Sequence, residues 1–442
     1  MPRQSAPILD REERMPLCRW FSESLPPYLR ASSIKPPMLP NRVNPQAQRC
    51  RVLFMISSME GGGSERQTLL LLRHLSREHF SPELLVLRRG GSLYDQIPAD
   101  VPVHCLTEPI HQRRFSWPGT IHRAQVSALQ RLLIERQIAV VYDRTFHMSL
   151  IAGPAAESVG VPRISTIVSP PSRAVPLNAG RFIAIKKRRL AHAYANAHQV
   201  IAVSAATAID AQRYYGLHAR QVLVIPNPVD QAELFALAAA AGGPARDARY
   251  TLVCVGRMSK EKGQRYLLQA LDRLRRQHPD FPVPRLWLVG DGPQRKSLEA
   301  MSSRWQLNDD VEFVGHVANP APWIAAADAL CLPSLFEGYP NVMLEAMALG
   351  TPVIASDLPV VRSLGRVAAN QEDRGLDYVA TFRSRDAGEL ARKIRRLWVN
   401  STATRSRMMA AKNLALRAHS LANILPRIES IMLQASHTKP VP

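Results

Sequence analysis

The chain has 442 residues, which is long for one domain and suggests two. Its net charge of +21 favours an anionic partner, either a nucleic acid or an acidic membrane surface. Aromatic residues make up only 6%, which argues against base stacking on nucleic acid, and no apolar run approaches the roughly 18 residues of a transmembrane helix.

The cysteines are odd in number and scattered, and no pair has the spacing of metal ligands. They are Cys18, Cys50, Cys105, Cys254 and Cys331. We therefore expect reduced, buried thiols in a cytoplasmic protein, with no metal and no cofactor.

Residues 1–48 are rich in Pro, Arg and Ser and have neither an apolar period nor a signal-peptide core. This composition predicts a largely disordered extension. Residues 50–56 predict a buried strand, which a glycine turn at residues 61–63 joins to an amphipathic helix at 66–79. The layout is typical of a phosphate-facing βα unit, although a tight connection without a ligand explains the glycines equally well.

The first domain continues as strands that alternate with helices, which predicts an α/β fold with a doubly wound parallel sheet. Its further strands are expected at 83–87, 138–143, 162–168, 199–204 and 222–225, and helices at 122–137 and 149–159. In such sheets, ligands bind at the carboxyl ends of the strands. The side chains at such ends are Arg144, His147, Ser169 and Arg173, with a purely structural role for His147 as the alternative.

Residues 181–197 predict a basic amphipathic helix that carries Lys186, Lys187, Arg188 and Arg189 beside apolar residues. Such a helix suits contact with an anionic lipid surface, and an ordinary solvated helix face fits the pattern as well. An Ala- and Gly-rich stretch at 236–248 is the best linker candidate. It separates a first domain at 49–235 from a second at 249–420, which leaves a C-terminal segment and tail at 421–442.

The second domain repeats the pattern with strands at 250–255, 285–289, 311–316 and 329–334, a weaker one at 377–380, and helices from 386 and 402. Arg257 and Lys262 lie in the turn after its first strand, between Gly256 and Gly263 and before a helix. Two cations at a helix N-terminus suit a diphosphate, whereas solvated loop charges are the alternative.

Residues 334–359 place two carboxylates, Glu337 and Glu345, eight positions apart. Pro340 suits the first turn of a helix, so Glu337 is expected in the preceding loop and Glu345 on the helix, while Gly338 permits close backbone approach. A nucleotide with an attached sugar needs carboxylates for its hydroxyls and N–H groups for its phosphates. The eight-residue spacing of the two carboxylates, taken alone, fits an exposed helix with two solvated side chains better than it fits such a site.

Several segments resemble glycosyltransferase family 4, a family of retaining enzymes with the GT-B fold. They are GRMSKEKG (256–263), LVGDGP (288–293), EFVGHV (312–317) and the run from 333 to 356, with GGGSE (61–65) and IPNPVD (225–230) in the first domain. The resemblance covers residues 50–420 and implies two Rossmann-like domains that face each other across a cleft, with a nucleotide-sugar donor on the second domain.

The resemblance also implies roles for individual residues. Arg257 and Lys262 would hold the donor diphosphate, Glu345 the ribose hydroxyls, and Glu337 the hydroxyls of the transferred sugar. The implied donor-binding set is Gly62, Gly63, Gly256, Arg257, Lys262, Gly338, Tyr339, Pro340, Asn341 and Glu345. Many members carry a His where this chain reads Ser165 to Ser169. His147 is the first-domain candidate for the catalytic set, with Glu337, Arg257 and Lys262, while Arg144 and Arg173 near the same strand ends are alternatives for the first-domain contact.

The expected function is transfer of a hexose or N-acetylhexosamine from a nucleoside diphosphate sugar, with UDP-sugars favoured over GDP-mannose. The expected acceptor is lipid-linked or a polysaccharide, at the inner face of the cytoplasmic membrane, where the basic protein would be peripheral; no nucleic-acid partner is expected. The alternatives are a non-catalytic nucleotide-sugar-binding subunit and another GT-B activity such as an epimerase.

Overall fold

The computed structural model describes residues 49–106, 119–178, 180–240, 242–245, 248–367, 379–402, 408, 412–413 and 416–438. The extension expected at 1–48 and most of the helix expected from 402 lie outside these residues.

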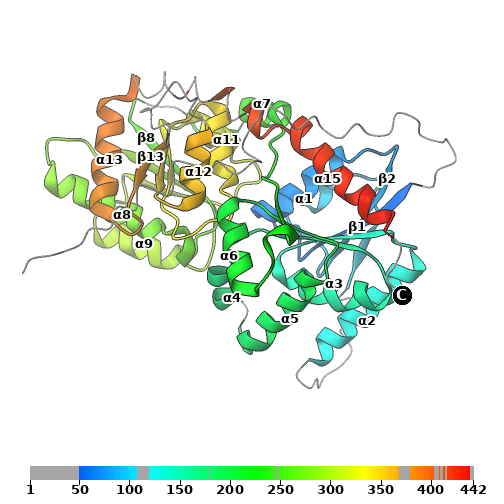
Figure 1. The fold of residues 1–442 in the computed structure, drawn as a ribbon. Helices are drawn as coiled ribbons and strands as arrows, with labels where there is room; N and C mark the ends of the chain where they lie inside the picture. Colours follow the sequence, from blue (N-terminus) through cyan, green and yellow to red (C-terminus); the bar gives the residue numbers. More distant parts are fainter. Residues whose placement is uncertain are drawn as a thin grey trace, which may run out of the picture. The chain divides into compact units, whose positions relative to one another are not determined.

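The first domain contains a parallel sheet, which confirms the α/β prediction (Figure 1). Its seven described strands are ordered β3-β2-β1-β4-β5-β6-β7. They are β1 (Cys50–Ile56), β2 (Phe80–Val86), β3 (Val103–Cys105), β4 (Val140–Arg144), β5 (Arg163–Ile167), β6 (Gln199–Ala202) and β7 (Val222–Val224). All neighbours pair in parallel, as the alternation of strands and helices predicts.

Helices cover both faces of this sheet because the central strand β1 is apolar on both sides. Val52, Phe54 and Ile56 point to the core that includes α1 (Gly63–His74) and α15 (Leu421–Ser436). Leu53 and Met55 point to the opposite core, with α2 (Thr120–Glu135) and α3 (Phe146–Ser158). Successive side chains of a strand alternate between its faces, so one short strand contributes to two cores.

The second domain contains another parallel sheet, ordered β10-β9-β8-β11-β12-β13 in the described residues. Its strands are β8 (Thr251–Val255), β9 (Arg285–Val289), β10 (Val311–Gly315), β11 (Ala329–Leu332), β12 (Val353–Ser356) and β13 (Val379–Phe382). One face packs on α8 (Gln264–Gln277) and α13 (Ala387–Val399). The other packs on α11 (Asn341–Leu349) and α12 (Pro359–Val367).

Most of the remaining helices lie where the apolar periodicity of the sequence predicts them, and the others lie in short connections between strands. They are α4 (Pro171–Asn178), α5 (Ile183–Ala195), α6 (Ala205–Tyr215), α7 (Gln231–Ala239), α9 (Arg295–Arg304) and α10 (Ala321–Ala326). The Ser204 hydroxyl caps α6 by accepting a hydrogen bond from the Thr207 N–H at 3.1 Å. Helix α7 extends four residues into the stretch expected to be a linker.

The C-terminal segment is an integral part of the first domain, which its sequence did not reveal. Helix α15 follows the second domain in sequence, yet it packs beside α1 and β1 (Figure 1). Ile424, Ile428 and Met432 are at most 3% exposed there. The Glu429 carboxylate also accepts a hydrogen bond from the Ser76 N–H at 2.8 Å.

Cys50, Cys254 and Cys331 are buried free thiols, as expected, whereas Cys105 is partly exposed and Cys18 lies outside the described residues. Within the described part of the chain, no helix combines the length and apolar character needed to cross a bilayer.

Each sheet reverses its strand order at one point, and the loops of interest follow the strands on either side of it. In the first sheet the reversal lies between β1 and β4, and in the second between β8 and β11. Loops at such a switch point diverge and leave room for a ligand at the carboxyl edge of the sheet. The glycine turn at 61–63 and the loops at 256–263 and 333–340 all occupy these positions.

Replacement of Ile428 by Ala tests whether α15 stabilises the first domain. Because this side chain is 3% exposed in the core of β1 and α1, we expect a loss of about 2–5 kcal/mol in the free energy of unfolding, measured by denaturant titration. The exposed Gln434→Ala change on the same helix is the control, and equal stability of the two variants would contradict the assignment.

Candidate functional site

An ion pair joins the two loops at the switch point of the second domain. Lys262, in the loop after β8, donates from Nζ to Oε1 of Glu337, in the loop after β11, at 2.7 Å. The Ser334 hydroxyl donates to the same oxygen at 2.7 Å. The side chains of Lys262 and Glu337 are 28% and 9% exposed. Both donors meet Oε1, so the contacts of the described residues leave Oε2 of Glu337 available to a substrate hydroxyl.

The environment keeps Lys262 charged. Burial alone lowers the pKa of this ammonium, but the adjacent Glu337 carboxylate more than compensates, and the pKa lies above its ordinary value of 10.5. The pair therefore contributes stability at neutral pH, which is lost as the pH rises through the raised pKa of Lys262. A fixed ammonium at the carboxyl edge of a parallel sheet is suited to a phosphate.

Glycines hold these loops against each other. A Cβ on Gly263, which has φ +67°, would lie 2.1 Å from the Pro333 carbonyl oxygen, and one on Gly290 would lie 2.3 Å from that of Gly256. These glycines are therefore required by backbone contact within the protein as well as by conformation. Arg257, next to Gly256, is exposed and so is accessible to a ligand.

Gly338 is required for a similar reason, which differs from the ligand approach that the sequence suggested. A Cβ at this position would lie 1.9 Å from the Val168 carbonyl oxygen and 2.7 Å from Cα of Ser169, both after β5. The Thr207 hydroxyl also donates to the Gly338 carbonyl at 3.4 Å. The loop that carries Glu337 therefore touches the carboxyl edge of the first sheet.

Asparagine and arginine side chains form a hydrogen-bonded chain between segments far apart in sequence. Arg144 Nη2 donates to Asn227 Oδ1 at 3.1 Å, and Asn227 Nδ2 donates to Asn341 Oδ1 at 2.8 Å. Asn341 Nδ2 then lies 3.4 Å from the Gly63 carbonyl oxygen. This chain brings together Arg144, Asn341 and the glycine turn, all of which the sequence singled out.

The first-domain end of that chain carries polar atoms without a partner. Arg144 is 3% exposed, and its Nε is buried with no hydrogen-bond partner among the described residues. The same holds for the hydroxyl of Thr145, whose backbone has φ +74°, a conformation that β-branched residues rarely adopt. Strained backbone and unpaired buried donors are features that cluster at ligand sites.

Glu345 lies on α11, as expected, and is partly buried. Burial raises the pKa of its carboxyl group, and the nearby Arg66 guanidinium partly opposes this effect. Arg66 in turn donates to the Gly61 carbonyl at 3.2 Å and to the Ala318 carbonyl at 2.8 Å. Glu345 is thus held near the glycine turn of the first domain.

Glu65 lies just after the glycine turn, and no pattern in the sequence assigned it a role. Its Oε2 would lie 2.5 Å from a Cβ on Gly62, so its carboxylate folds back over the glycine turn. Burial raises the pKa of Glu65, and the charges of Arg144 and Arg257 act to lower it. The sequence also gave no role to Asn227, because no local pattern links it to Asn341, 114 positions away.

The Tyr339 side chain is part of the core of the second domain. Its side chain is 9% exposed, and its hydroxyl lies 2.9 Å from Nδ1 of His419. Burial lowers the pKa of His419 to about 4, so this histidine is neutral at physiological pH. The backbone carbonyl of His419 accepts a hydrogen bond from the Val229 N–H at 2.8 Å. Tyr339 therefore anchors the loop beneath Glu337 through packing and this hydrogen bond.

His147 lies in the first turn of α3 and is exposed. Its ring stacks on Phe146, with centroids 4.0 Å apart. Although the residue is exposed overall, packing of its ring on Phe146 removes part of its hydration; this desolvation and the Lys186 charge lower its pKa, while a hydrogen bond to the Asn178 backbone acts in the opposite direction. The contacts given by the structure thus place His147 with α4 and α5, and none of them joins it to Lys262 or Glu337. Arg173 is exposed on α4.

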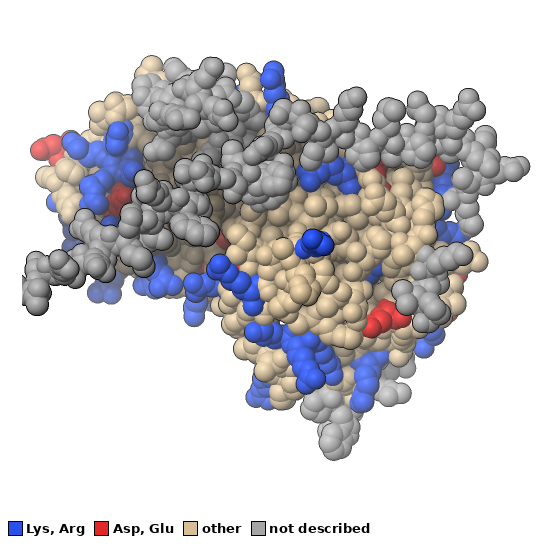
Figure 2. All heavy atoms as spheres, viewed as in Figure 1, with Lys and Arg blue, Asp and Glu red and all other residues tan. Residues whose placement is uncertain are grey.

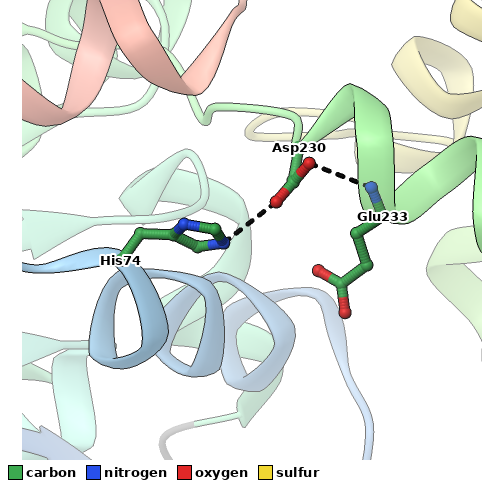
Figure 3. Close-up of side chains that lie close together, drawn as sticks. All are labelled: His74, Asp230 and Glu233. Carbon is green, nitrogen blue, oxygen red and sulfur yellow. Dashed lines mark hydrogen bonds and ion pairs between the residues drawn. The ribbon is translucent and has the colours of Figure 1, made fainter.

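One group of potential metal ligands occurs in the described residues, at the junction of α1 and α7 (Figure 3). His74 Nε2 lies 2.9 Å from Oδ2 of Asp230, whose Oδ1 accepts a hydrogen bond from the Glu233 N–H. The Glu233 carboxylate lies below Asp230 in Figure 3, with one oxygen within 4.8 Å of the ligand atoms of His74 and Asp230, and it accepts a hydrogen bond from Arg73. Each group already has a partner, so the arrangement acts as a polar link between the two helices.

Gly338→Ala tests the contact with the first sheet. Because the added Cβ meets a backbone oxygen, we expect a loss of about 1–3 kcal/mol in the free energy of unfolding, measured by denaturant titration. Gly365→Ala is the control, because its Cβ would lie 3.8 Å from the nearest side-chain atom, an ordinary contact inside α12. A Gly338→Ala protein as stable as this control would show that the contact is not needed.

Glu337→Gln tests the electrostatics of the ion pair. Removal of the carboxylate leaves burial as the largest effect on Lys262, so its pKa should fall below the wild-type value. Titration of the lysine side chain by NMR measures this change. The control is Glu312→Gln, an exposed site on β10, which should leave the titration of Lys262 unchanged; an unchanged curve in Glu337→Gln would disprove the coupling.

Comparison with known proteins agrees with this geometry. The family model for Glycosyltransferase Family 4 matches residues 61–233, and that for Glycosyl transferases group 1 matches residues 249–400. A glycogen synthase of Mycobacterium tuberculosis is 30% identical over 280 residues, which are 60% of this chain and 62% of that protein. The lipopolysaccharide core biosynthesis glycosyltransferase LpsD of Rhizobium meliloti is 36% identical over 107 residues, 24% of this chain and 29% of that protein.

These matches cover less than two thirds of the length of the curated relatives. The fold is shared more widely. The crystal structure of the Anabaena HepE protein in complex with UDP and glucose superposes with a TM-score of 0.70 at 20% identity, over 87% of this chain and 100% of that one. The two family models together span more than half of the sequence, one in each domain. The chain therefore belongs to the glycosyltransferases of family 4 and group 1, and it has their two-domain GT-B fold.

Proposed function

We propose that this protein is a retaining glycosyltransferase that moves a hexose or N-acetylhexosamine from a nucleoside diphosphate sugar to a lipid-linked or polysaccharide acceptor. The observation that carries the proposal is the Lys262–Glu337 ion pair, with Ser334 on the same carboxylate oxygen, at the switch point of the second sheet. It combines a fixed cation for a phosphate with an oriented carboxylate for sugar hydroxyls.

The site must stabilise the negative charge of the departing nucleoside diphosphate. Cleavage of the glycosyl–phosphate bond develops negative charge on the nucleoside diphosphate. Lys262 and the exposed Arg257 would stabilise that charge, and so lower the barrier selectively in the transition state. These two cations would do so without a metal ion. Oε2 of Glu337 would hold the transferred sugar, and Glu345 the ribose.

The first domain would complete the site through backbone and arginine groups. Gly63 approaches Asn341 through its carbonyl, and Arg144 is connected to Asn341 through Asn227. Its unpaired buried Nε makes Arg144 the best candidate for a first-domain contact to the donor or acceptor. Arg144 suits this role better than His147, whose contacts lie with α4 and α5.

A UDP-sugar is the favoured donor. The support is fold-level analogy: HepE was crystallised in complex with UDP, with UDP and glucose, and with UDP-glucose. A lipid-linked or saccharide acceptor agrees with the similarity to LpsD and with the basic helix α5. We place the protein at the inner face of the cytoplasmic membrane as a peripheral enzyme.

The decisive experiment measures release of nucleoside diphosphate from a panel of UDP-, GDP- and ADP-sugars, with and without a bacterial lipid extract. We expect acceptor-dependent release from one UDP-sugar, without added metal and in the presence of EDTA. Glu337→Gln and Lys262→Ala should each lower kcat at least about a hundredfold, because each removes a preorganised charge from the reacting centre.

Matched controls separate this effect from a general change of charge. Lys260→Ala removes an exposed cation from the same loop, and Glu312→Gln removes an exposed carboxylate from β10; both should retain activity. The anomeric configuration of the product, measured by NMR, tests retention. Donor binding by calorimetry without turnover of any donor would contradict the proposal and indicate a non-catalytic binding subunit.

A further inference from the structure

A groove lies on the first domain between α2, α3 and α5, and its lining contains none of the candidate donor-binding residues. Its volume is about 790 Å³. Val126, Leu150 and Ile185 supply apolar lining from these three helices. The groove is therefore a second concave surface, apart from the Lys262–Glu337 site, and large enough for part of a small ligand.

Cationic and imidazole groups line the same groove. Arg123 and His122 come from α2, and Arg188, Arg189 and His192 come from α5. Arg123, Arg188 and Arg189 are exposed, and none of them makes an ion pair with another described residue. Figure 2 shows Lys and Arg side chains gathered over α5.

The only acidic residue that lines the groove within the described part of the chain does not neutralise these arginines. Glu157 Oε2 lies 3.3 Å from His192 Nε2, and Asn196 Nδ2 donates to Glu157 Oε1 at 2.9 Å. Arg123, Arg188 and Arg189 therefore line the groove without an acidic partner among the described residues. Burial lowers the pKa of His122, and the Arg189 charge acts in the same direction.

Exposed apolar side chains continue from the groove along the same helices. Ile185 is 53% exposed, and its neighbour Phe182, at the start of α5, is 62% exposed. Ile121 on α2 is 52% exposed, next to His122. Contiguous exposed apolar surface rimmed by polar residues is a feature of protein and membrane interaction sites. Anionic headgroups above acyl chains present these two chemistries together.

We propose that the groove between α2, α3 and α5 binds the phosphate headgroup of an anionic phospholipid in a bilayer. Arg123, Arg188 and Arg189 contact the phosphate, while Phe182, Ile185 and Ile121 enter the interfacial layer. The inference rests on the membrane-face location in the proposed function and specifies its contact surface. It does not depend on transfer activity, because the donor-binding loops belong to other segments.

Vesicle flotation of the full chain tests this contact. We expect binding to vesicles that contain phosphatidylglycerol, weak binding to phosphatidylcholine vesicles, and a decrease with added salt. Arg188→Gln with Arg189→Gln should weaken binding to the anionic vesicles about tenfold or more, since each basic residue at an anionic surface contributes substantially. Phe182→Asn should also weaken binding; Asn tolerates the left-handed backbone of this residue, φ +63°.

The control removes two exposed cations outside the groove, Arg220 and Lys296, by the changes Arg220→Gln and Lys296→Gln. This protein should float like the wild type. An equal loss of vesicle binding in the control and in the groove variant would overturn the proposal, because binding would then depend only on the total charge of the protein. Binding to double-stranded RNA instead of anionic vesicles would overturn it as well.

A second measurement uses the unaltered protein. Soluble short-chain phosphatidylglycerol should raise the pKa of His122, followed by NMR, because an anion between His122 and Arg189 favours the protonated ring. An unchanged pKa at lipid concentrations that saturate binding would contradict a headgroup site in the groove. UDP binding by calorimetry should be the same in wild type and groove variants, so failure of this inference is distinguishable from failure of the proposed transferase.

Discussion

The ion pair between Lys262 and Glu337 is the interaction on which the candidate site depends. It joins loops after β8 and β11, which are neighbours at the point where the strand order reverses among the described strands of the second sheet. A charge-assisted hydrogen bond of this kind contributes about 1.5–3 kcal/mol, enough to hold both loops in one arrangement. Hydrogen bonds within the protein itself orient both charged groups, which is the condition for electrostatic stabilisation without reorganisation.

Close backbone contacts of the two loops support this ion pair. Gly263 lies against Pro333, and Gly338 lies against Val168 and Ser169 of the first domain. Tyr339 is anchored by His419, which lies just before α15, and α15 belongs to the core of the first domain. The loop that carries Glu337 is thus fixed by groups from both domains. Its position depends on the return of the chain to the first domain at its C-terminus.

Much of the fold was predictable because buried parallel strands are short apolar runs between glycine turns and amphipathic helices. This pattern located nearly all of the strands, and the positions of Glu337 before α11 and Glu345 on it. It did not identify α15 as part of the first domain, because an amphipathic helix shows that it has a partner without showing which one. It did not show that the Tyr339 side chain is buried, because a tyrosine that packs inside a loop and one that contacts a ligand look alike in sequence.

The sequence by itself determined the α/β class, the two-domain organisation and the loops that carry the charged residues. Local patterns suffice for these, since strand and helix periodicity and glycine turns act over a few residues. Only the tertiary structure decided that Lys262 meets Glu337, that Arg144 reaches Asn341 through Asn227, and that α2 and α5 form a cationic groove. These contacts join residues far apart in the chain, and their geometry follows from the packing of the sheets and helices rather than from any local pattern.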